Sequence, residues 1–99
     1  MIQVMVGYKL QEGANIEHIF RKIRSAAMNY PGFMGAQNLQ NTRDPSIVAL
    51  VSTWENIEAW HNWEQSSVRR EINEEAKPLV VEELRVSIYN IVPTVTWRR

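Results

Sequence analysis

Residues 47–60 read IVALVSTWENIEAW and contain the clearest strand signal of the chain, followed by the start of a helix. Residues 47–54 are rich in β-branched and aromatic side chains and predict a strand. Asn56 follows at a position typical of a helix N-cap, so a helix is expected directly after it. A strand that ends in Trp54 and a helix that carries Trp60 therefore lie next to each other in the chain.

The rest of the chain is divided into segments by two patterns of apolar residues, the alternation typical of strands and the three-and-four spacing typical of helices. Apolar side chains alternate at the start of the chain and then recur at spacings of three and four from Ile16 to Ala27. Tyr30-Pro31-Gly32 ends that helix, and Ser66-Ser67 is a point at which the second helix can divide in two. The expected strands span residues 1–10, 33–41, 47–54 and 84–92, and the expected helices span residues 14–29 and 57–76.

The element order is strand, helix, strand, strand, helix, strand, which is the ferredoxin-like βαββαβ arrangement of the α+β class. Right-handed crossovers place the first and third strands at the centre of the sheet and both helices on one face. Val48, Leu50 and Ser52 are expected on one face of the third strand, and Leu84, Val86 and Ile88 together on one face of the last.

The second face of the sheet is also expected to be apolar, because Ile47, Ala49 and Val51 lie on it together with Tyr89 and Ile91. No other segment of the chain is left to cover it. We therefore expect a homodimer in which two sheets pack face to face, since a monomer would expose a large apolar patch.

Length and composition limit the class of protein. The chain has 99 residues, which predicts one domain over residues 1–99. Eleven Lys and Arg balance eleven Asp and Glu, so no basic surface for nucleic acid or for a membrane is expected. There is no cysteine, which excludes disulfides, thiolate metal sites and a thiol nucleophile. The absence of a signal-like start or a long apolar run favours a cytoplasmic protein.

Motifs for phosphate binding and for metal binding are absent. The four glycines form no GxGxxG or GxxxxGK pattern, and His18 and His61 have no carboxylate–histidine motif around them. Asp44 is the single aspartate and lies in a turn beside a proline, so a Ser–His–Asp triad is not expected. No metal site and no bound cofactor are predicted.

Tryptophan is the unusual residue: Trp54, Trp60 and Trp63 fall within ten positions, and Trp97 is the fourth. These rings either fill the core between helix and sheet or form the flat walls of a pocket for a planar aromatic ligand.

Other polar side chains near this stretch also allow two interpretations. His61 can handle protons at the rim of such a pocket, or it is a solvated helix residue. Tyr8 can bind a phenolic ligand through its hydroxyl, or it bonds a neighbour. Arg69, Arg70 and Glu71 are interpreted as a solvated helix face.

Residues 51–68 resemble the antibiotic biosynthesis monooxygenase (ABM) family. The shared pattern is a strand that ends in Trp, a polar turn, Ala followed by an aromatic residue, Trp three positions on, and then Ser. In this chain these residues are Trp54, Ala59, Trp60, Trp63 and Ser66, and Pro31-Gly32-Phe33 is similar to a family turn.

The resemblance implies a dimeric α+β barrel, which agrees with the dimer expected from the strand faces. It also implies an oxygenase that acts on polycyclic phenols or quinols with O₂ and without metal, flavin or haem. A second branch of the family degrades haem with a Trp, a His and an Asn. Trp63 matches its Trp, but Asn73 stands at the His position and the first strand has no Asn. Haem degradation of that type is therefore disfavoured.

We expect a pocket between sheet and helices with Trp54, Trp60 and Trp63 as walls. Tyr8 is expected to anchor the substrate, and His61 or Asn73 is the polar group near the mouth. The alternatives are a dimer that binds a small ligand without catalysis and, less favoured, a haem-binding protein.

Overall fold

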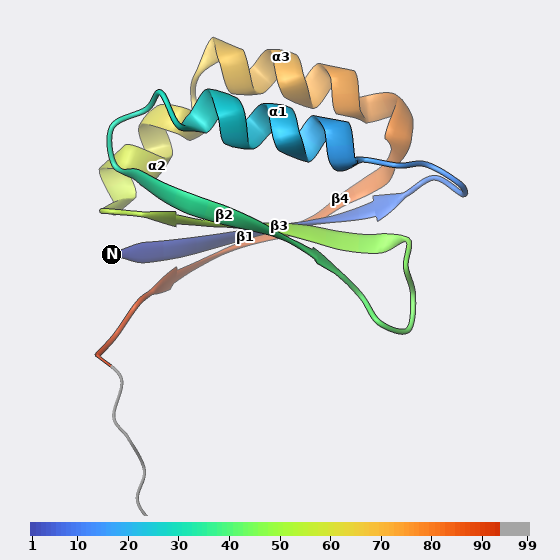
Figure 1. The fold of residues 1–99 in the computed structure, drawn as a ribbon, viewed down its shortest axis with the longest axis horizontal. Coiled ribbons are helices and arrows are strands. Elements are labelled where there is room, and N and C mark those ends of the chain that lie inside the picture. Colours follow the sequence, from blue (N-terminus) through green and yellow to red (C-terminus); the bar gives the residue numbers. More distant parts are fainter. Residues whose placement is uncertain (94–99) are drawn as a thin grey trace, which may run out of the picture.

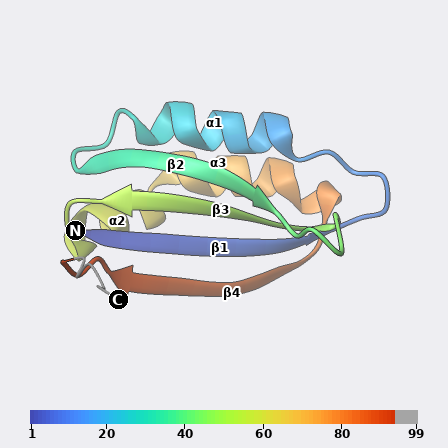
Figure 2. The same ribbon diagram turned by 60° about the horizontal axis from the view of Figure 1, so that its bottom comes forward.

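A computed structural model describes residues 1–93 and shows one layer of strands covered by one layer of helices (Figure 1). The elements are β1 (Ile2–Leu10), α1 (Glu17–Ala27), β2 (Phe33–Gln40), β3 (Ile47–Trp54), α2 (Ile57–Glu64), α3 (Ser67–Ala76), a 3₁₀ turn (Lys77–Leu79) and β4 (Val80–Asn90). The strand order is β2-β3-β1-β4, and all neighbouring strands are antiparallel (Figure 2). The ferredoxin-like prediction, with the first and third strands at the centre, is confirmed.

The core lies between the sheet and the helices. Alternate residues of β1 are buried, because successive strand side chains point to opposite faces and only one face meets the helices. The apolar stripe expected on α1 is buried as well, at Ile19, Phe20, Ile23 and Ala27. Trp97, which lies beyond residue 93, is outside the described residues.

The second helical stretch is divided at Ser66, as the two serines predicted. Asn56 Oδ1 accepts a hydrogen bond from the Ala59 amide at 2.9 Å and caps α2. Ser66 Oγ accepts one from the Arg69 amide at 3.1 Å and caps α3, while the same hydroxyl donates to the Trp63 carbonyl at 2.7 Å. The two caps fix the direction of each helix and therefore which side chains face the sheet.

The last strand begins earlier than predicted, at Val80 instead of Leu84. Glu82 pairs with Lys9 and Glu83 with Tyr8 in the ladder to β1. Two consecutive glutamates are tolerated here because β4 is an edge strand, where one side of the ladder remains accessible to water.

A β-bulge in β4 changes which face of the sheet its side chains point to, and the prediction for the last strand is corrected accordingly. The register to β1 shifts between Val6 and Tyr8, so β4 contains one extra residue there. The Leu84 Cβ lies 3.2 Å from the position that a Cβ on Gly7 would occupy, which places Leu84 on the face away from the helices. Leu84 therefore does not share a face with Val86 and Ile88.

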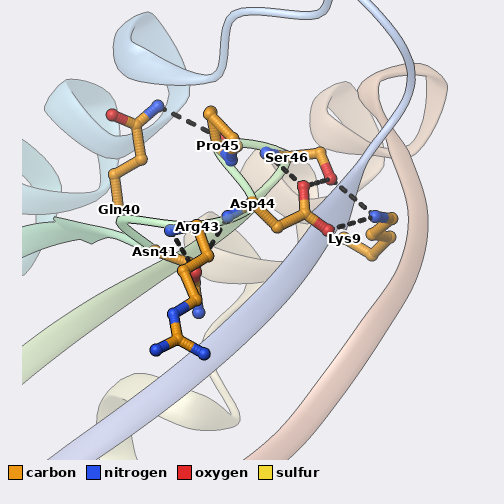
Figure 3. Close-up of polar contacts among 7 residues, drawn as sticks. All are labelled: Lys9, Gln40, Asn41, Arg43, Asp44, Pro45 and Ser46. Carbon is orange, nitrogen blue, oxygen red and sulfur yellow. Dashed lines mark hydrogen bonds and ion pairs between the residues drawn. The ribbon is translucent and has the colours of Figure 1, made fainter.

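The hairpin between β2 and β3 is fastened to β1 by a polar cluster (Figure 3). Lys9 Nζ donates to Asp44 Oδ2 at 2.9 Å and to Ser46 Oγ at 2.6 Å. Hydrogen bonds from Ser46 and then Lys9 lower the pKa of the Asp44 carboxyl to about 2. The turn aspartate thus stabilises the loop, and neither histidine is among its partners.

The opposite face of the sheet carries no helix among residues 1–93 (Figure 1). Exposed apolar side chains lie along it, including Met5 at 38%, Leu39 at 43% and Tyr89 at 57% exposure. This face agrees with the expectation of an apolar second surface. None of the described helices is long and apolar enough to cross a membrane.

Candidate functional site

Three indoles fill the space where the sheet meets α2. Trp54, Trp60 and Trp63 are each at most 2% exposed. Trp54 packs edge-on against Trp60 with ring centroids 6.0 Å apart, and Trp63 packs against Tyr30 at 5.0 Å. Trp54 Nε1 donates to the buried Ser52 hydroxyl at 2.9 Å.

The interior cavity that these rings line has a volume of only about 20 Å³. A single water needs roughly 10–15 Å³ measured in this way, so no aromatic ring fits in this conformation. The expectation of an open, flat-walled pocket between the tryptophans is corrected: interior side chains pack to near-crystalline density and close it.

Arg69 lines this cavity, although the sequence placed it on a solvated face. Its guanidinium carbon lies 5.3 Å from the centroid of the Trp60 ring, in cation–π geometry, and the side chain lines the cavity. Among residues 1–93, no carboxylate lies within 4.0 Å of it. Ser66 is the sequence signal from which the position of Arg69 could have been predicted. As the N-cap it fixes where α3 begins, and the start of the helix determines that Arg69 faces Trp60.

Trp60 has an unpaired donor. In the described part of the chain, its Nε1 is the one buried side-chain nitrogen or oxygen without a hydrogen-bond partner. Leaving such a group unpaired costs about 1–3 kcal/mol, so it marks a position at which an acceptor would be favourable.

Tyr8 lies on β1 between two cavities. It lines the interior cavity together with Trp60 and Arg69, and it also lines a more open pocket between α3 and β4. Burial raises the pKa of the Tyr8 phenol to about 12, with a further contribution from Glu83, while Arg69 acts in the opposite direction. The hydroxyl therefore stays protonated at neutral pH and is available as a donor.

The pocket between α3 and β4 has a volume of about 260 Å³ and brings Tyr8 and Asn73 together. The Val80 and Val81 side chains supply apolar lining, and Glu82 and Glu83 supply acidic groups. Two of the predicted site residues thus meet, through the early start of β4 that the sequence did not reveal. We call this space the Tyr8–Asn73 pocket.

His61 does not join these residues. It is exposed on α2, and its Nδ1 lies 3.2 Å from Glu64 Oε1 on the same helix. It lines neither the interior cavity nor the Tyr8–Asn73 pocket. Of the two interpretations of His61, the structure agrees with the solvated helix residue, because α2 turns Trp60 and Trp63 toward the core and leaves His61 on its exposed side.

A larger hollow lies at the other end of the sandwich. An open groove of about 760 Å³ runs between the β1–α1 loop and the β2–β3 hairpin, with Leu10, Phe20 and Val48 at its base. None of the predicted site residues lines it.

Haem ligation by histidine does not fit the Tyr8–Asn73 pocket. His18 and His61 are both exposed on helix surfaces, and neither lines that pocket. Amide and carboxylate oxygens are weaker ligands of haem iron than imidazole, and Tyr8, which would have to bind as a phenolate, stays protonated because burial raises its pKa to about 12. Residues 1–93 also contain no cluster of three or more His, Cys, Asp or Glu side chains suited to a metal ion.

The fold and site define a small two-layer α+β protein with an aromatic core beside a polar edge pocket. The profile of the family named Antibiotic biosynthesis monooxygenase matches residues 1–75, and the chain belongs to this family. No curated protein sequence matches the chain significantly.

Solved structures share the fold at low identity. A Deinococcus radiodurans protein assigned to the antibiotic biosynthesis monooxygenases is 14% identical, with 100% of each chain covered and a TM-score of 0.83. SnoaB, a cofactor-independent oxygenase from Streptomyces nogalater, is 12% identical, with 95% of each chain covered and a TM-score of 0.81. Rv0793 from Mycobacterium tuberculosis is 8% identical, with 96% of this chain and 98% of that chain covered and a TM-score of 0.80.

Proposed function

We propose that this protein is a monooxygenase that oxidises a planar phenolic or quinol compound with O₂ and without metal, flavin or haem. Membership of the ABM family supports the monooxygenase class, and SnoaB, which shares the fold, is a cofactor-independent oxygenase. The observation that carries the proposal is the Tyr8–Asn73 pocket, which adjoins an aromatic core through Tyr8.

In this proposal Tyr8 and Asn73 supply the polar contacts to the substrate. The protonated Tyr8 hydroxyl donates to a phenolic or carbonyl oxygen, and the Asn73 amide can both donate and accept. Trp60, Trp63 and Trp54 line the interior cavity on the other side of Tyr8 and form the aromatic wall of the site there. No role is proposed for His61, because it faces water.

In an anthrone-type phenol the reaction converts a ring CH₂ and O₂ into a ring C=O and H₂O. In a quinol it converts one ring C–H and the two O–H groups, with O₂, into a hydroxyquinone and H₂O. The substrate loses a proton and its carbanion supplies the electrons that reduce oxygen, so no redox group of the protein takes part. One oxygen atom enters the product and the other leaves as water. The protein contributes orientation and removal of bulk water.

We also propose a homodimer with the helix-free faces of two sheets in contact. Exposed Met5, Leu39 and Tyr89 give this face the apolar character typical of permanent interfaces. Two-fold symmetry lets the same surface serve both subunits. A cytoplasmic location stays a prediction from the sequence.

Oxygen uptake tests the enzymatic proposal. The purified protein, treated with a chelator, is given 1,8-dihydroxyanthrone and hydroquinones in an oxygen-electrode cell, with protein-free controls for autoxidation. We expect uptake of one O₂ per quinone formed, loss of rate in Tyr8→Phe and Asn73→Ala, and an unchanged rate in His61→Ala. No uptake above the protein-free rate across the panel would contradict the proposal.

A second candidate is a dimer that binds a small aromatic ligand without catalysis. The specific observation in its favour is the closure of the tryptophan-lined interior to about 20 Å³, which leaves little room for a reacting ring. Saturable binding of the same compounds without oxygen consumption would favour this candidate over the oxygenase.

A further inference from the structure

The polar groups around the interior cavity are nearly all donors. Trp60 Nε1 is buried and unpaired, Arg69 has no carboxylate within 4.0 Å among residues 1–93, and the Tyr8 hydroxyl is protonated at neutral pH. Ser52 is the acceptor on this wall, and its hydroxyl already takes the Trp54 hydrogen bond. A wall rich in free donors, on which the Ser52 acceptor is already engaged, fits a ligand that brings an oxygen with negative charge.

The two arginines on the cavity differ in how they are held. The Arg24 guanidinium, on α1, donates to Asn38 Oδ1 on β2, so it is tied to the sheet. Arg69, on α3, is held by its stack on Trp60. A half-buried arginine on a helix surface has four flexible bonds, so Arg69 is the one that can leave its position at low cost.

We propose that Arg69 is both the cover of the interior cavity and the anchor for an ionised ligand oxygen. The aromatic ring of a phenolate or enolate enters the space that the guanidinium leaves beside Trp60, with its oxygen in the plane of the indole. The displaced guanidinium then turns to the ligand oxygen, and Trp60 Nε1 gains the acceptor that it lacks. The ligand class is a planar aromatic anion. Tyr8 lines both cavities and connects this site to the Tyr8–Asn73 pocket, so Arg69 is a residue that selects the ionised form of the substrate.

Charged side chains on the neighbouring elements also favour an anion in the interior cavity. Arg24 from α1 adds positive charge at the same cavity, and Tyr8 from β1 is neutral. Glu83 from β4 is the opposing carboxylate, and it lies beside Tyr8 on the side of the Tyr8–Asn73 pocket. The interior side of Tyr8 therefore favours an anion, and the β4 side does not.

This inference rests on the proposed function for its substrate class, but its test does not need turnover. The probe is 4-nitro-1-naphthol, whose nitro group brings its ionisation close to neutral pH and whose anion is yellow. Its matched control is 1-methoxy-4-nitronaphthalene, which has the same ring system and cannot ionise. Binding of each compound is measured by equilibrium dialysis, and the ionisation of the bound naphthol is followed by absorbance.

We expect the naphtholate to bind the wild-type protein at least about tenfold more tightly than the methoxy compound, the size of one charge-assisted hydrogen bond. Binding then lowers the pKa of the naphthol by about one unit. Arg69→Gln removes both effects, and Arg69→Lys keeps the charge but recovers only part of the affinity because it loses the planar stack. Arg70→Gln, an exposed neighbour on the same helix, changes affinity less than about twofold.

Several outcomes would overturn the inference. These are equal binding of the two compounds, equal effects of Arg69→Gln and Arg70→Gln, and no binding of either compound up to its solubility limit. Trp60→Phe gives an independent check, since it removes the Nε1 donor and keeps an aromatic face. Circular dichroism verifies that each variant is folded.

The result separates this inference from the oxygenase proposal. Arg69-dependent naphtholate binding without oxygen uptake supports the anchor and contradicts the enzyme. Oxygen uptake that Arg69→Gln leaves unchanged supports the enzyme and contradicts the anchor.

Discussion

Trp54 Nε1 donates a hydrogen bond to the hydroxyl of Ser52, two residues earlier on β3, at 2.9 Å. Both side chains are buried on the face that meets the helices, because residues i and i+2 of a strand point the same way. The indole N–H of Trp54 thus finds its hydrogen-bond acceptor within its own strand, whereas the indole N–H of Trp60 has no acceptor among the described residues.

Ser52→Ala should leave Trp54 Nε1 without an acceptor and lower the free energy of unfolding by about 1–3 kcal/mol. Chemical denaturation measures the change. Ser25→Ala, the same substitution at an exposed position of α1, should stay within about 0.5 kcal/mol of wild type. Equal effects of the two variants would show that the hydrogen bond contributes nothing.

Gly32→Ala should be among the most destabilising small substitutions. Gly32 has φ +91, and an added Cβ would lie 2.5 Å from the Ala59 Cβ, so strain and collision act together. Positive φ costs about 1–3 kcal/mol by itself. Gly13→Ala is the control, because Gly13 has φ +75 but nothing within 4 Å of an added Cβ. Thermal unfolding should rank Gly32→Ala well below Gly13→Ala, and the reverse order would contradict the close packing of this turn against α2.

Ser66→Ala should destabilise the protein by about 1 kcal/mol, the usual cost of losing an N-cap. The hydroxyl caps α3 at the Arg69 amide and also binds the Trp63 carbonyl. Ser67→Ala, one residue on and exposed, should have little effect on the urea midpoint. If both variants unfold at the same urea concentration, Ser66 does not fix the start of α3.

Tyr8 should ionise about two pH units above an ordinary tyrosine, since its pKa is raised from 10.0 to about 12 by burial and by Glu83. A raised pKa means that the stabilising contribution is complete below about pH 10 and is lost as the pH rises toward 12. The difference between ultraviolet titrations of wild type and Tyr8→Phe isolates this step. A Tyr8 transition near pH 10 in the folded protein would contradict its burial.

Met5→Lys should dissociate the proposed dimer, because it places a charge in the middle of the helix-free face of the sheet. Sedimentation velocity of wild type should give a species of twice the chain mass of 11.6 kDa, and the variant should sediment at the chain mass. Met28→Lys is the matched control, since Met28 is 74% exposed at the end of α1 on the helix side. A wild-type protein that is monomeric at micromolar concentration would end the dimer proposal.

The sequence predicted much of the fold because its signals are local. Alternation along residues 1–10 and a three-and-four repeat from Ile16 determine which side chains are buried in β1 and α1. Asn56 and Ser66 marked the starts of α2 and α3 for the same reason, since an N-cap acts within three residues.

The start of β4 was missed because it depends on a partner strand. Glu82 and Glu83 do not look like strand residues, and only their pairing with Lys9 and Tyr8 makes them so. The bulge that moves Leu84 to the other face is likewise a property of two strands together.

The element order, the family pattern around Trp54 and Trp60, and the aromatic and polar candidates could all be predicted from the sequence. That the indoles fill the interior, that Tyr8 and Asn73 share a pocket, that His61 faces water and that Arg69 lies over Trp60 became visible only in the packed fold. Periodicity is set by a few neighbouring residues, whereas a cavity is the volume left after side chains from several elements have packed.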